Sequence, residues 1–332
     1  MKTIRFRSPT RVDLAGGTLD LWPLYNFVGG AATINIAIDI MTTAEITPLE
    51  GGEIEMISDD LNFQKSFGSL EECLQDSDSK LSLLKAQLHY WKPRQGFRLQ
   101  TRSESPVGGG LGGSSSLTIS LLKAFNQFCG GKMTDVHQMV EVAHNLEAQV
   151  LNTPTGTQDY YPAASGGINI LRYSVEGIEQ EVLDAETSVL AQNFMLVYTG
   201  KAHHSGLNNF EVLTKAVQKD PQTLKALMDL KIIAEETTEA VRGGKWNLLP
   251  GLFQREFKAR VKLAPAFSSP EIDKLAEVSL QAGASAVKIC GAGGGGCVLV
   301  WAEPATQERV KAACQGAGFQ VLAAKPVGKL PI

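Results

Sequence analysis

The stretch S-P-V-G-G-G-L-G-G-S-S-S-L-T-I-S, residues 105–120, decides how the rest of this chain is interpreted. Five glycines lie close together in it, and three serines then open an apolar run with helical spacing. Glycines let a backbone wrap closely around an anion, and the N–H groups at a helix start point at it with the helix dipole behind them. Serines at that position can cap the helix and can offer hydroxyls to a phosphate-bound metal. The stretch therefore predicts a phosphate-binding loop.

Two familiar phosphate-binding fingerprints do not explain this loop. Gly108, Gly110 and Gly113 fit G-x-G-x-x-G, but that fingerprint usually opens the first βαβ unit of a dinucleotide-binding fold. Here about a hundred residues precede the loop, and no acidic residue closes a second strand after it. The pattern G-x-x-x-x-G-K-[ST] is absent from the sequence, which excludes a Walker-type P-loop. A flexible glycine-rich turn without a ligand is the alternative interpretation.

Length and composition limit the class of protein. A chain of 332 residues exceeds the size at which single cores stop growing, so two domains are expected. The net charge of −4, without a Lys/Arg cluster, argues against a nucleic-acid partner. The 5 cysteines are dispersed and include no C-x-x-C pair, which indicates free thiols in a reducing compartment. With neither a signal peptide nor a long apolar run, we expect a cytoplasmic protein without a membrane partner. A homo-oligomer is possible.

Hydrophobic periodicity predicts the elements of the first half. Isoleucines at alternate positions from 34 to 40 mark a long half-buried strand over 31–48. Residues 53–58, after Gly51-Gly52, are expected to be its hairpin partner. The other expected elements are strands at 3–7 and 10–15 separated by Pro9, a helix over 81–91, and a strand over 96–101 that leads into the glycine loop.

The second half predicts a long helical region between strands. A helix is expected from Thr134 to Val150, and the stretch 151–167 is too polar and broken to form an element. Strands are expected at 168–173 and 194–199, with helices filling most of 203–283. The chain then closes as β–loop–β–α–β between 284 and 323, and the domain break is expected near residue 185.

Three glycine-containing motifs far apart in the sequence carry a resemblance to a known family. They are S-P-T-R-V-D-L-A-G-G-T-L-D at 8–20, the loop at 105–116, and K-I-C-G-A-G-G-G-G-C at 288–297. Together, in this order, they resemble the GHMP kinase superfamily. The segments G-T-Q-D at 156–159 and Y-T-G at 198–200 make the chain most similar to the branch of bacterial sugar kinases typified by D-glycero-D-manno-heptose 7-phosphate kinase.

The resemblance implies an α+β fold of two domains. It implies an N-terminal ATP-binding α/β domain over 1–185, with a left-handed βαβ unit, and a ferredoxin-like C-terminal domain over 186–332. The implied activity is Mg²⁺-dependent transfer of the ATP γ-phosphoryl group to a hydroxyl of a small molecule. The acceptor implied by the sugar-kinase branch is a sugar or sugar phosphate.

The resemblance also assigns the cofactor and metal residues. Ser114 falls where the loop serine of the family meets Mg²⁺, with Ser115 as the alternative because G-G-S-S-S leaves the register open by one. Glu147 has the spacing of the Mg²⁺-binding glutamate. The residues implied for ATP are Pro106, Gly108, Gly109, Gly110, Leu111, Gly112, Gly113, Ser114, Ser115 and Ser116.

Catalytic and acceptor-binding residues follow from the first motif and the G-T-Q-D segment. Asp159 matches the catalytic aspartate, which accepts or orients the hydroxyl proton, and Arg11 matches the cation that steadies this carboxylate. Asp20 is expected on acceptor hydroxyls, although G-G-T-L-D is one residue longer than the usual G-G-T-D. Further acceptor contacts are expected from Gly17, Gly293, Gly294 and His203. Lys288 is expected to be solvated at a strand edge.

Two alternative functions are compatible with these motifs. A mevalonate-pathway kinase or the related decarboxylase shares the fold, and Asp20 argues for a polyhydroxylated acceptor instead. A non-catalytic nucleotide or sugar sensor is the other alternative. The presence of Arg11, Ser114, Glu147 and Asp159 together argues against it, because a sensor needs neither a metal ligand nor a proton acceptor.

Overall fold

The computed structural model describes residues 2–185, 189–202, 205–291 and 293–331. Its first sheet is mixed and seven-stranded, in the order β4-β3-β5-β2-β6-β7, with β1 paired to β2. These strands are β1 (Ile4–Ala15), β2 (Ala31–Pro48), β3 (Ile54–Ser58), β4 (Phe63–Phe67), β5 (Phe97–Ser103), β6 (Ile168–Ser174) and β7 (Gly177–Leu183). The 18-residue β2 is the centre of this sheet: β1 covers one edge, while β5 and β6 share the other edge at opposite ends.

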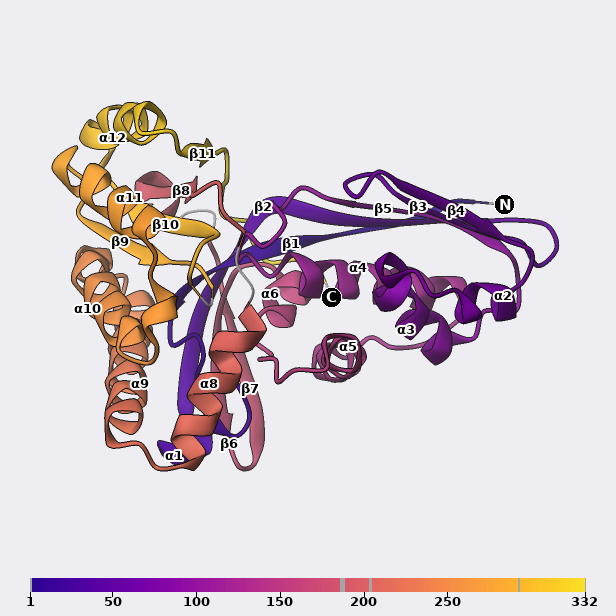
Figure 1. The fold of residues 1–332 in the computed structure, drawn as a ribbon, viewed down its shortest axis with the longest axis horizontal. Helices are drawn as coiled ribbons and strands as arrows, with labels where there is room; N and C mark the ends of the chain where they lie inside the picture. Colours follow the sequence, from indigo (N-terminus) through magenta and orange to yellow (C-terminus); the bar gives the residue numbers. More distant parts are fainter. Residues whose placement is uncertain (1, 186–188, 203–204, 292, 332) are drawn as a thin grey trace.

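Helices cover one face of the first sheet (Figure 1). The central one is α4 (Gly113–Phe128), which starts at the glycine loop and packs on β1 and β2. Its apolar positions, Ile119, Leu122 and Phe125, are buried, as the helical spacing predicts. Its neighbouring helices are α3 (Ser82–Trp91), α5 (Val136–Leu151) and α6 (Tyr160–Ser165), and the remaining helical segments of the first half are α1 (Leu24–Phe27), α2 (Leu70–Gln75) and η1 (Ser79–Leu81).

The second sheet is four-stranded and antiparallel, in the order β11-β8-β10-β9. Its strands are β8 (Phe194–Tyr198), β9 (Ala286–Ile289), β10 (Cys297–Trp301) and β11 (Gln320–Leu322). The accompanying helical segments are α7 (Leu190–Asn193), α8 (Ser205–Val217), α9 (Pro221–Arg242), η2 (Trp246–Leu248), α10 (Leu249–Val261), η3 (Pro265–Phe267), α11 (Pro270–Gln281) and α12 (Pro304–Gly316). This β–helices–β–β–α–β connection and strand order are ferredoxin-like, as expected.

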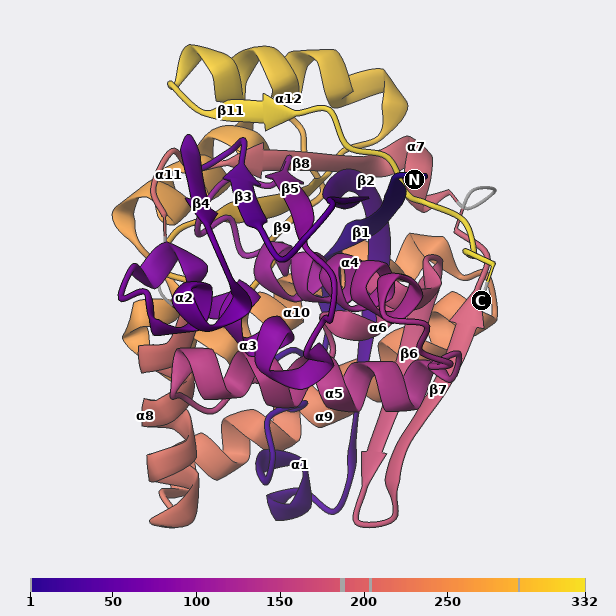
Figure 2. The same ribbon diagram turned by 90° about the vertical axis from the view of Figure 1, so that its right-hand side faces the viewer.

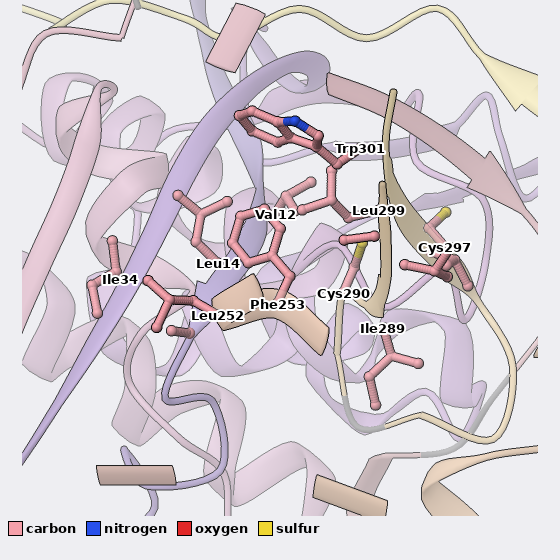
Figure 3. Packing of buried hydrophobic residues seen from close by; sticks show 14 of the residues in the cluster. Val12, Leu14, Ile34, Leu252, Phe253, Ile289, Cys290, Cys297, Leu299 and Trp301 are labelled. Carbon is pink, nitrogen blue, oxygen red and sulfur yellow. The ribbon is translucent and has the colours of Figure 1, made fainter. Parts of the chain in front are cut away.

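The two sheets share one hydrophobic core. Figure 3 shows Val12 and Leu14 of β1 beside Phe253 of α10 and Leu299 and Trp301 of β10. Phe253 and Trp301 meet edge to face, with 5.8 Å between their ring centroids. The sheets therefore meet where β1 passes under α10 and the C-terminal sheet.

The C-terminal tail returns to the first sheet (Figures 1 and 2). Asp39 donates its backbone N–H to the carbonyl of Lys325, and Leu330 donates to Ser165 at 2.7 Å. The strand pairing changes from the first sheet to the second between β7 and β8, on either side of residue 185. The last residues of the chain thus pack with the first half.

Three local predictions were wrong, and two strands were missed. Pro9 does not separate two strands, because β1 continues through it with a register shift between Pro9 and Thr10, where a missing N–H is tolerated. Residues 54–58 do not pair with β2, since β5 lies between them and runs parallel to β3. The strands β4 and β7 were not predicted. The stretch 151–167 contains the short buried helix α6.

Among the described residues, every helix is too short or too polar to cross a membrane.

Candidate active site

The glycine loop and the start of α4 form the floor of the larger of two adjoining cavities. Gly108, Gly110 and Gly112 adopt positive φ angles of 64°, 72° and 68°, which side chains rarely allow. The cavity has a volume of about 440 Å³. It is lined by Arg11, Asp60, Leu61, Ser103, Ser105, Pro106, Val107, Gly108, Gly109, Gly110, Leu111, Gly112, Gly113, Ser114, Ser115, Leu117, Glu147, Leu151, Thr155, Asp159 and Gly291. A backbone cradle at a helix N-terminus suits an anion such as a phosphate chain.

The three serines at the start of α4 point to different places. Ser114 and Ser115 line the cavity together with Glu147, and both oppose the rise in the pKa of that carboxyl. Ser116 is fully buried instead, donating to the Ser8 carbonyl at 3.0 Å and meeting the Thr42 hydroxyl at 2.8 Å. The helix turns the Ser116 hydroxyl toward β1 and β2, so this side chain does not line the cavity, unlike those of Ser114 and Ser115.

Glu147 lies at the bottom of the same cavity. Its side chain comes from α5 and is 3% exposed, and the Tyr160 hydroxyl donates to it at 2.8 Å. Burial raises the pKa of this carboxyl, whereas the hydrogen bonds from Ser114, Tyr160 and Ser115 oppose the shift. The described residues include no cluster of three or more His, Cys, Asp or Glu side chains that could hold a metal alone. One carboxylate with two hydroxyls nevertheless suits Mg²⁺, which keeps several waters and shares substrate phosphates.

Arg11 connects the glycine loop, the C-terminal domain and Asp159. Its Nε donates to Asp159 Oδ1 at 2.7 Å, and Nη2 lies 2.6 Å from the same oxygen. Its Nη1 donates to the carbonyls of Gly110 at 2.6 Å and Cys290 at 2.8 Å. Burial opposes the charge of Arg11, but the Asp159 and Asp13 carboxylates outweigh it and raise the pKa of the guanidinium. Arg11 is therefore a charged clamp that fixes one oxygen of Asp159.

Asp20 and Asp159 line a second, smaller cavity that adjoins the first. Its volume is about 80 Å³, and Arg11, Thr155, Asp159 and Gly291 belong to both cavities. The remaining lining residues are Thr18, Asp20, Leu21, Gly156, Gln158, Asn209 and Arg260. The smaller cavity thus combines hydrogen-bonding side chains with a carboxylate shared with the phosphate cradle.

The Asp20 carboxylate is held at the wall of the smaller cavity by Gln158. The backbone N–H of Gln158 donates to Oδ2 at 3.1 Å, and its Nε2 donates to Oδ1 at 3.3 Å. Burial and the nearby Asp159 charge raise the pKa of Asp20 to about 6. The extra residue in G-G-T-L-D therefore does not remove Asp20 from the site.

Three glycines expected to contact the acceptor lie behind the site. A Cβ on Gly17 would lie 2.2 Å from Asp13 Oδ2, and one on Gly293 would lie 2.2 Å from the Phe267 carbonyl. Gly294 packs beside the Ala266 carbonyl. These positions have room for backbone only, and none of the three lines the smaller cavity. This geometry therefore lends no support to the expected acceptor contacts of Gly17, Gly293 and Gly294, whereas their neighbours Thr18 and Gly291 do line the smaller cavity. His203 lies outside the described residues.

The C-terminal glycine loop packs directly on the phosphate cradle. Cys297 donates its N–H to the Gly109 carbonyl at 2.7 Å, and a Cβ on Gly291 would lie 2.9 Å from Gly110 Cα. Only glycine allows two backbones to approach so closely. Two segments far apart in the sequence thus form one wall.

Lys288 is not solvated, contrary to the expectation. Its side chain is fully buried between Asp13 and Glu256, with Nζ 3.6 Å from a carboxylate oxygen of each. Arg260 of α10, which sequence reasoning did not single out, pairs with the same two carboxylates and lines the smaller cavity. A lysine inside the apolar strand A-V-K-I was the available signal for a buried ion pair.

Comparison with known families agrees with this geometry. The profile for the GHMP kinases N terminal domain matches residues 80–167, and the profile for the GHMP kinases C terminal matches residues 250–319. The chain belongs to the GHMP kinase superfamily. As a GHMP kinase it carries out ATP-dependent phosphoryl transfer to a small molecule with an alcohol group.

Individual relatives of this GHMP kinase differ in their substrates. It is 26% identical over 313 residues to the D-glycero-alpha-D-manno-heptose 7-phosphate kinase of Campylobacter jejuni, covering 92% of this chain and 91% of the relative. It is 25% identical over 286 residues to the mevalonate kinase of Methanocaldococcus jannaschii, covering 82% of this chain and 86% of that relative. The crystal structure of a D-glycero-D-manno-heptose 1-phosphate kinase from Bacteroides thetaiotaomicron superposes with a TM-score of 0.78 at 22% identity, over 98% of this chain and 97% of that one.

Proposed function

We propose that this GHMP kinase transfers the γ-phosphoryl group of ATP, with Mg²⁺, to a hydroxyl of a sugar or sugar phosphate. The observation that carries the proposal is that Asp159 belongs to both cavities, one built for phosphates and one lined by Asp20 and other polar groups. Phosphoryl transfer requires the acceptor hydroxyl and the phosphate chain to meet at such a shared wall.

The glycine loop and α4 bind the phosphate chain in this proposal. The backbone of residues 108–115 lines the cavity, and the N-terminus of the 16-residue α4 adds N–H donors and its dipole. The donors are fixed before ATP arrives, so little reorganisation is needed as charge develops on the phosphoryl oxygens. Ser114 and Glu147 would hold Mg²⁺ together with the phosphates, and the bound ion would supply neutralisation of part of that charge.

Asp159 acts on the acceptor hydroxyl. Arg11 makes both of its contacts with Oδ1, so Oδ2 is the oxygen of Asp159 that Arg11 does not bind, and it lies beside Gly112 of the loop. That oxygen can accept the proton of the hydroxyl or orient it toward the phosphoryl group. Arg11 holds the carboxylate in one orientation.

Asp20 favours a sugar as the acceptor. A carboxylate beside the Gln158 amide and the Thr18 and Asn209 side chains can hydrogen-bond several hydroxyls of one ligand. The similarity to heptose phosphate kinases supports the same class. The similarity to mevalonate kinases, at 25% identity, makes mevalonate the second acceptor to be tested.

An acceptor screen tests the proposal. Purified protein with ATP and Mg²⁺ is incubated with hexoses, heptoses, their phosphates and mevalonate, and ADP release and the phosphorylated product are measured. We expect ADP release with a sugar or a sugar phosphate, abolished by Asp159→Asn. If mevalonate alone is phosphorylated, mevalonate replaces a sugar as the assigned acceptor. If no acceptor in the panel supports ADP release, the proposed function is refuted.

A further inference from the structure

Oppositely charged side chains from both domains are buried together behind the smaller cavity. Asp13 comes from β1, Lys288 from β9, and Glu256 and Arg260 from α10, and each is at most 1% exposed. Arg260 Nη2 lies 2.7 Å from Asp13 Oδ2 and also contacts Glu256. Lys288 Nζ donates to the Asp13 carbonyl at 2.5 Å. We call these four residues the charge cluster; its formal charges sum to zero.

The charge cluster supports the turn that carries Asp20. Gly17 rests on the ion pair: a Cβ there would lie 2.2 Å from Asp13 Oδ2 and 2.7 Å from Arg260 Nη2. The turn bends at Gly16 and Thr18, which have positive φ angles of 84° and 81°. A conformation of this kind persists only when its surroundings fix it. The Asp13–Arg260 pair is the surface against which this turn is fixed.

Arg260 also holds the other segment that lines the smaller cavity. Its Nη1 donates to the Gly291 carbonyl at 3.3 Å, and Gly291 follows Cys290, whose carbonyl accepts from Arg11. The forked guanidinium thus reaches β1, the C-terminal glycine loop and its own helix at once. A buried ion-pair cluster contributes little net stability compared with apolar side chains of the same volume. Holding the contacting segments in one geometry therefore explains the charge cluster better than a gain in stability does.

We propose that Arg260 is a positioning residue for the acceptor: held by Asp13 and Glu256, it fixes the Asp20 turn and Gly291 as two walls of the acceptor pocket. This inference rests on the proposed function, because it takes the smaller cavity as the acceptor site. It predicts a larger effect on acceptor binding than on ATP binding, because Arg260 lines only the smaller cavity, although Gly291 lines both.

Two variants of Arg260 test this role. The double variant Arg260→Met, Glu256→Gln removes one cation and one anion, so no unpaired charge remains in the core. Arg260→Lys keeps the charge, but one ammonium cannot reach Asp13, Glu256 and Gly291 with the same geometry. The matched control is Arg255→Met, Glu236→Gln, which removes an exposed ion pair between α9 and α10.

We expect the acceptor KM of the double variant to rise about 10–100-fold, because small displacements of positioning groups have effects of this size. Arg260→Lys should show a smaller rise, and the ATP KM should stay within about threefold of wild type in both. A second readout avoids turnover: the acceptor should no longer raise the melting temperature of the double variant, whereas a non-hydrolysable ATP analogue still should.

The possible outcomes separate the inference from the proposed function. A wild-type enzyme that phosphorylates a sugar, with an unchanged acceptor KM in both Arg260 variants, overturns the inference alone. Equal increases in the ATP and acceptor KM values also overturn it, since they indicate a general structural defect. If the wild type phosphorylates no acceptor, the proposed function fails and the inference fails with it.

Discussion

The Arg11 guanidinium binds one oxygen of Asp159 through two nitrogens, at 2.7 Å from Nε and 2.6 Å from Nη2. Both contacts use Oδ1. Because the carboxylate is planar and rigid, fixing Oδ1 also restricts the position of the second oxygen, Oδ2. Arg11 is itself fixed by carbonyls from the glycine loop and from the C-terminal domain. The orientation of the expected catalytic carboxylate therefore depends on both domains.

Replacing Asp159 with asparagine should remove the group that accepts or orients the hydroxyl proton. We expect kcat to fall by about 10²–10⁴-fold, the usual contribution of a positioned acid or base. ATP binding, measured by calorimetry, should persist because the glycine loop binds the phosphates. The control Asp229→Asn alters an exposed carboxylate on α9 and should leave kcat unchanged. An Asp159→Asn enzyme within about threefold of wild type would exclude the assigned role.

Arg11→Lys should lower kcat although it keeps the charge. A lysine cannot bind Asp159 through two nitrogens while also donating to two carbonyls. The loss of a charged hydrogen bond is worth about 1.5–3 kcal/mol, which corresponds to roughly 10–100-fold in rate. Arg7→Lys, on the same strand and paired with the exposed Glu104 at 3.2 Å, is the matched control. Equal kinetics for the two variants would show that the paired geometry of Arg11 is unimportant.

Ser114→Ala and Glu147→Gln should each raise the Mg²⁺ concentration needed for half-maximal activity. Metal binding requires the ionised carboxylate, and burial raises the pKa of Glu147. Apparent Mg²⁺ affinity should therefore increase as the pH rises and this carboxyl loses its proton. Glu147→Gln should remove that pH dependence. If Mg²⁺ titrations of the wild type and Glu147→Gln coincide at all pH values, Glu147 is not a metal ligand.

Asp20→Asn should stabilise the protein while impairing acceptor use. The pKa of Asp20 is raised from 3.8 to about 6, so the folded state binds its proton more tightly than the unfolded state does. Ionised Asp20 therefore lowers stability increasingly as the pH rises through this range, by about 1–3 kcal/mol once it is fully ionised. Thermal melting should show the gain from Asp20→Asn at pH 8 and little gain near pH 4. A variant less stable than wild type at pH 8 would contradict this.

Local sequence signals were sufficient for the elements that their own periodicity defines. The alternating isoleucines of β2 and the apolar stripe of α4 were located from the sequence, and the three glycine motifs identified the superfamily. The structure also brings Arg11, Asp20, Glu147 and Asp159 to two adjoining cavities, as the motifs led us to expect. The motifs predict these positions because each motif determines the backbone conformation around its own functional residues.

Features set by distant contacts were not accessible to sequence reasoning. Nothing local shows that β5 inserts between β2 and β3, since a period of two fixes the faces of a strand and not its partner. Gly17 was assigned to the acceptor because its motif suggested it, but it is crowded by the Asp13–Arg260 pair, whose arginine lies far along the chain. Lys288 was assigned to solvent because its partners come from β1 and α10. Burial of a charge depends on such partners, and they are visible only in three dimensions.

The charge cluster gives the last prediction, which concerns stability. Lys288→Met should destabilise the protein by about 3–5 kcal/mol, because Asp13 and Glu256 would then share one cation in the core. Lys311→Met, which removes an exposed lysine 4.0 Å from Glu308, should change stability by less than about 1 kcal/mol.

Adding Glu256→Gln to Lys288→Met should recover much of this loss, because it removes the excess negative charge and leaves the Asp13–Arg260 pair in place. Urea unfolding of the single and double variants gives the coupling free energy directly. The double variant should raise the acceptor KM less than the Arg260 variants do, because Arg260 keeps its pair with Asp13 and the glutamine amide oxygen can still accept from it. If the two substitutions are simply additive, Lys288 and Glu256 do not interact energetically, and the neutrality of the cluster does not govern its stability.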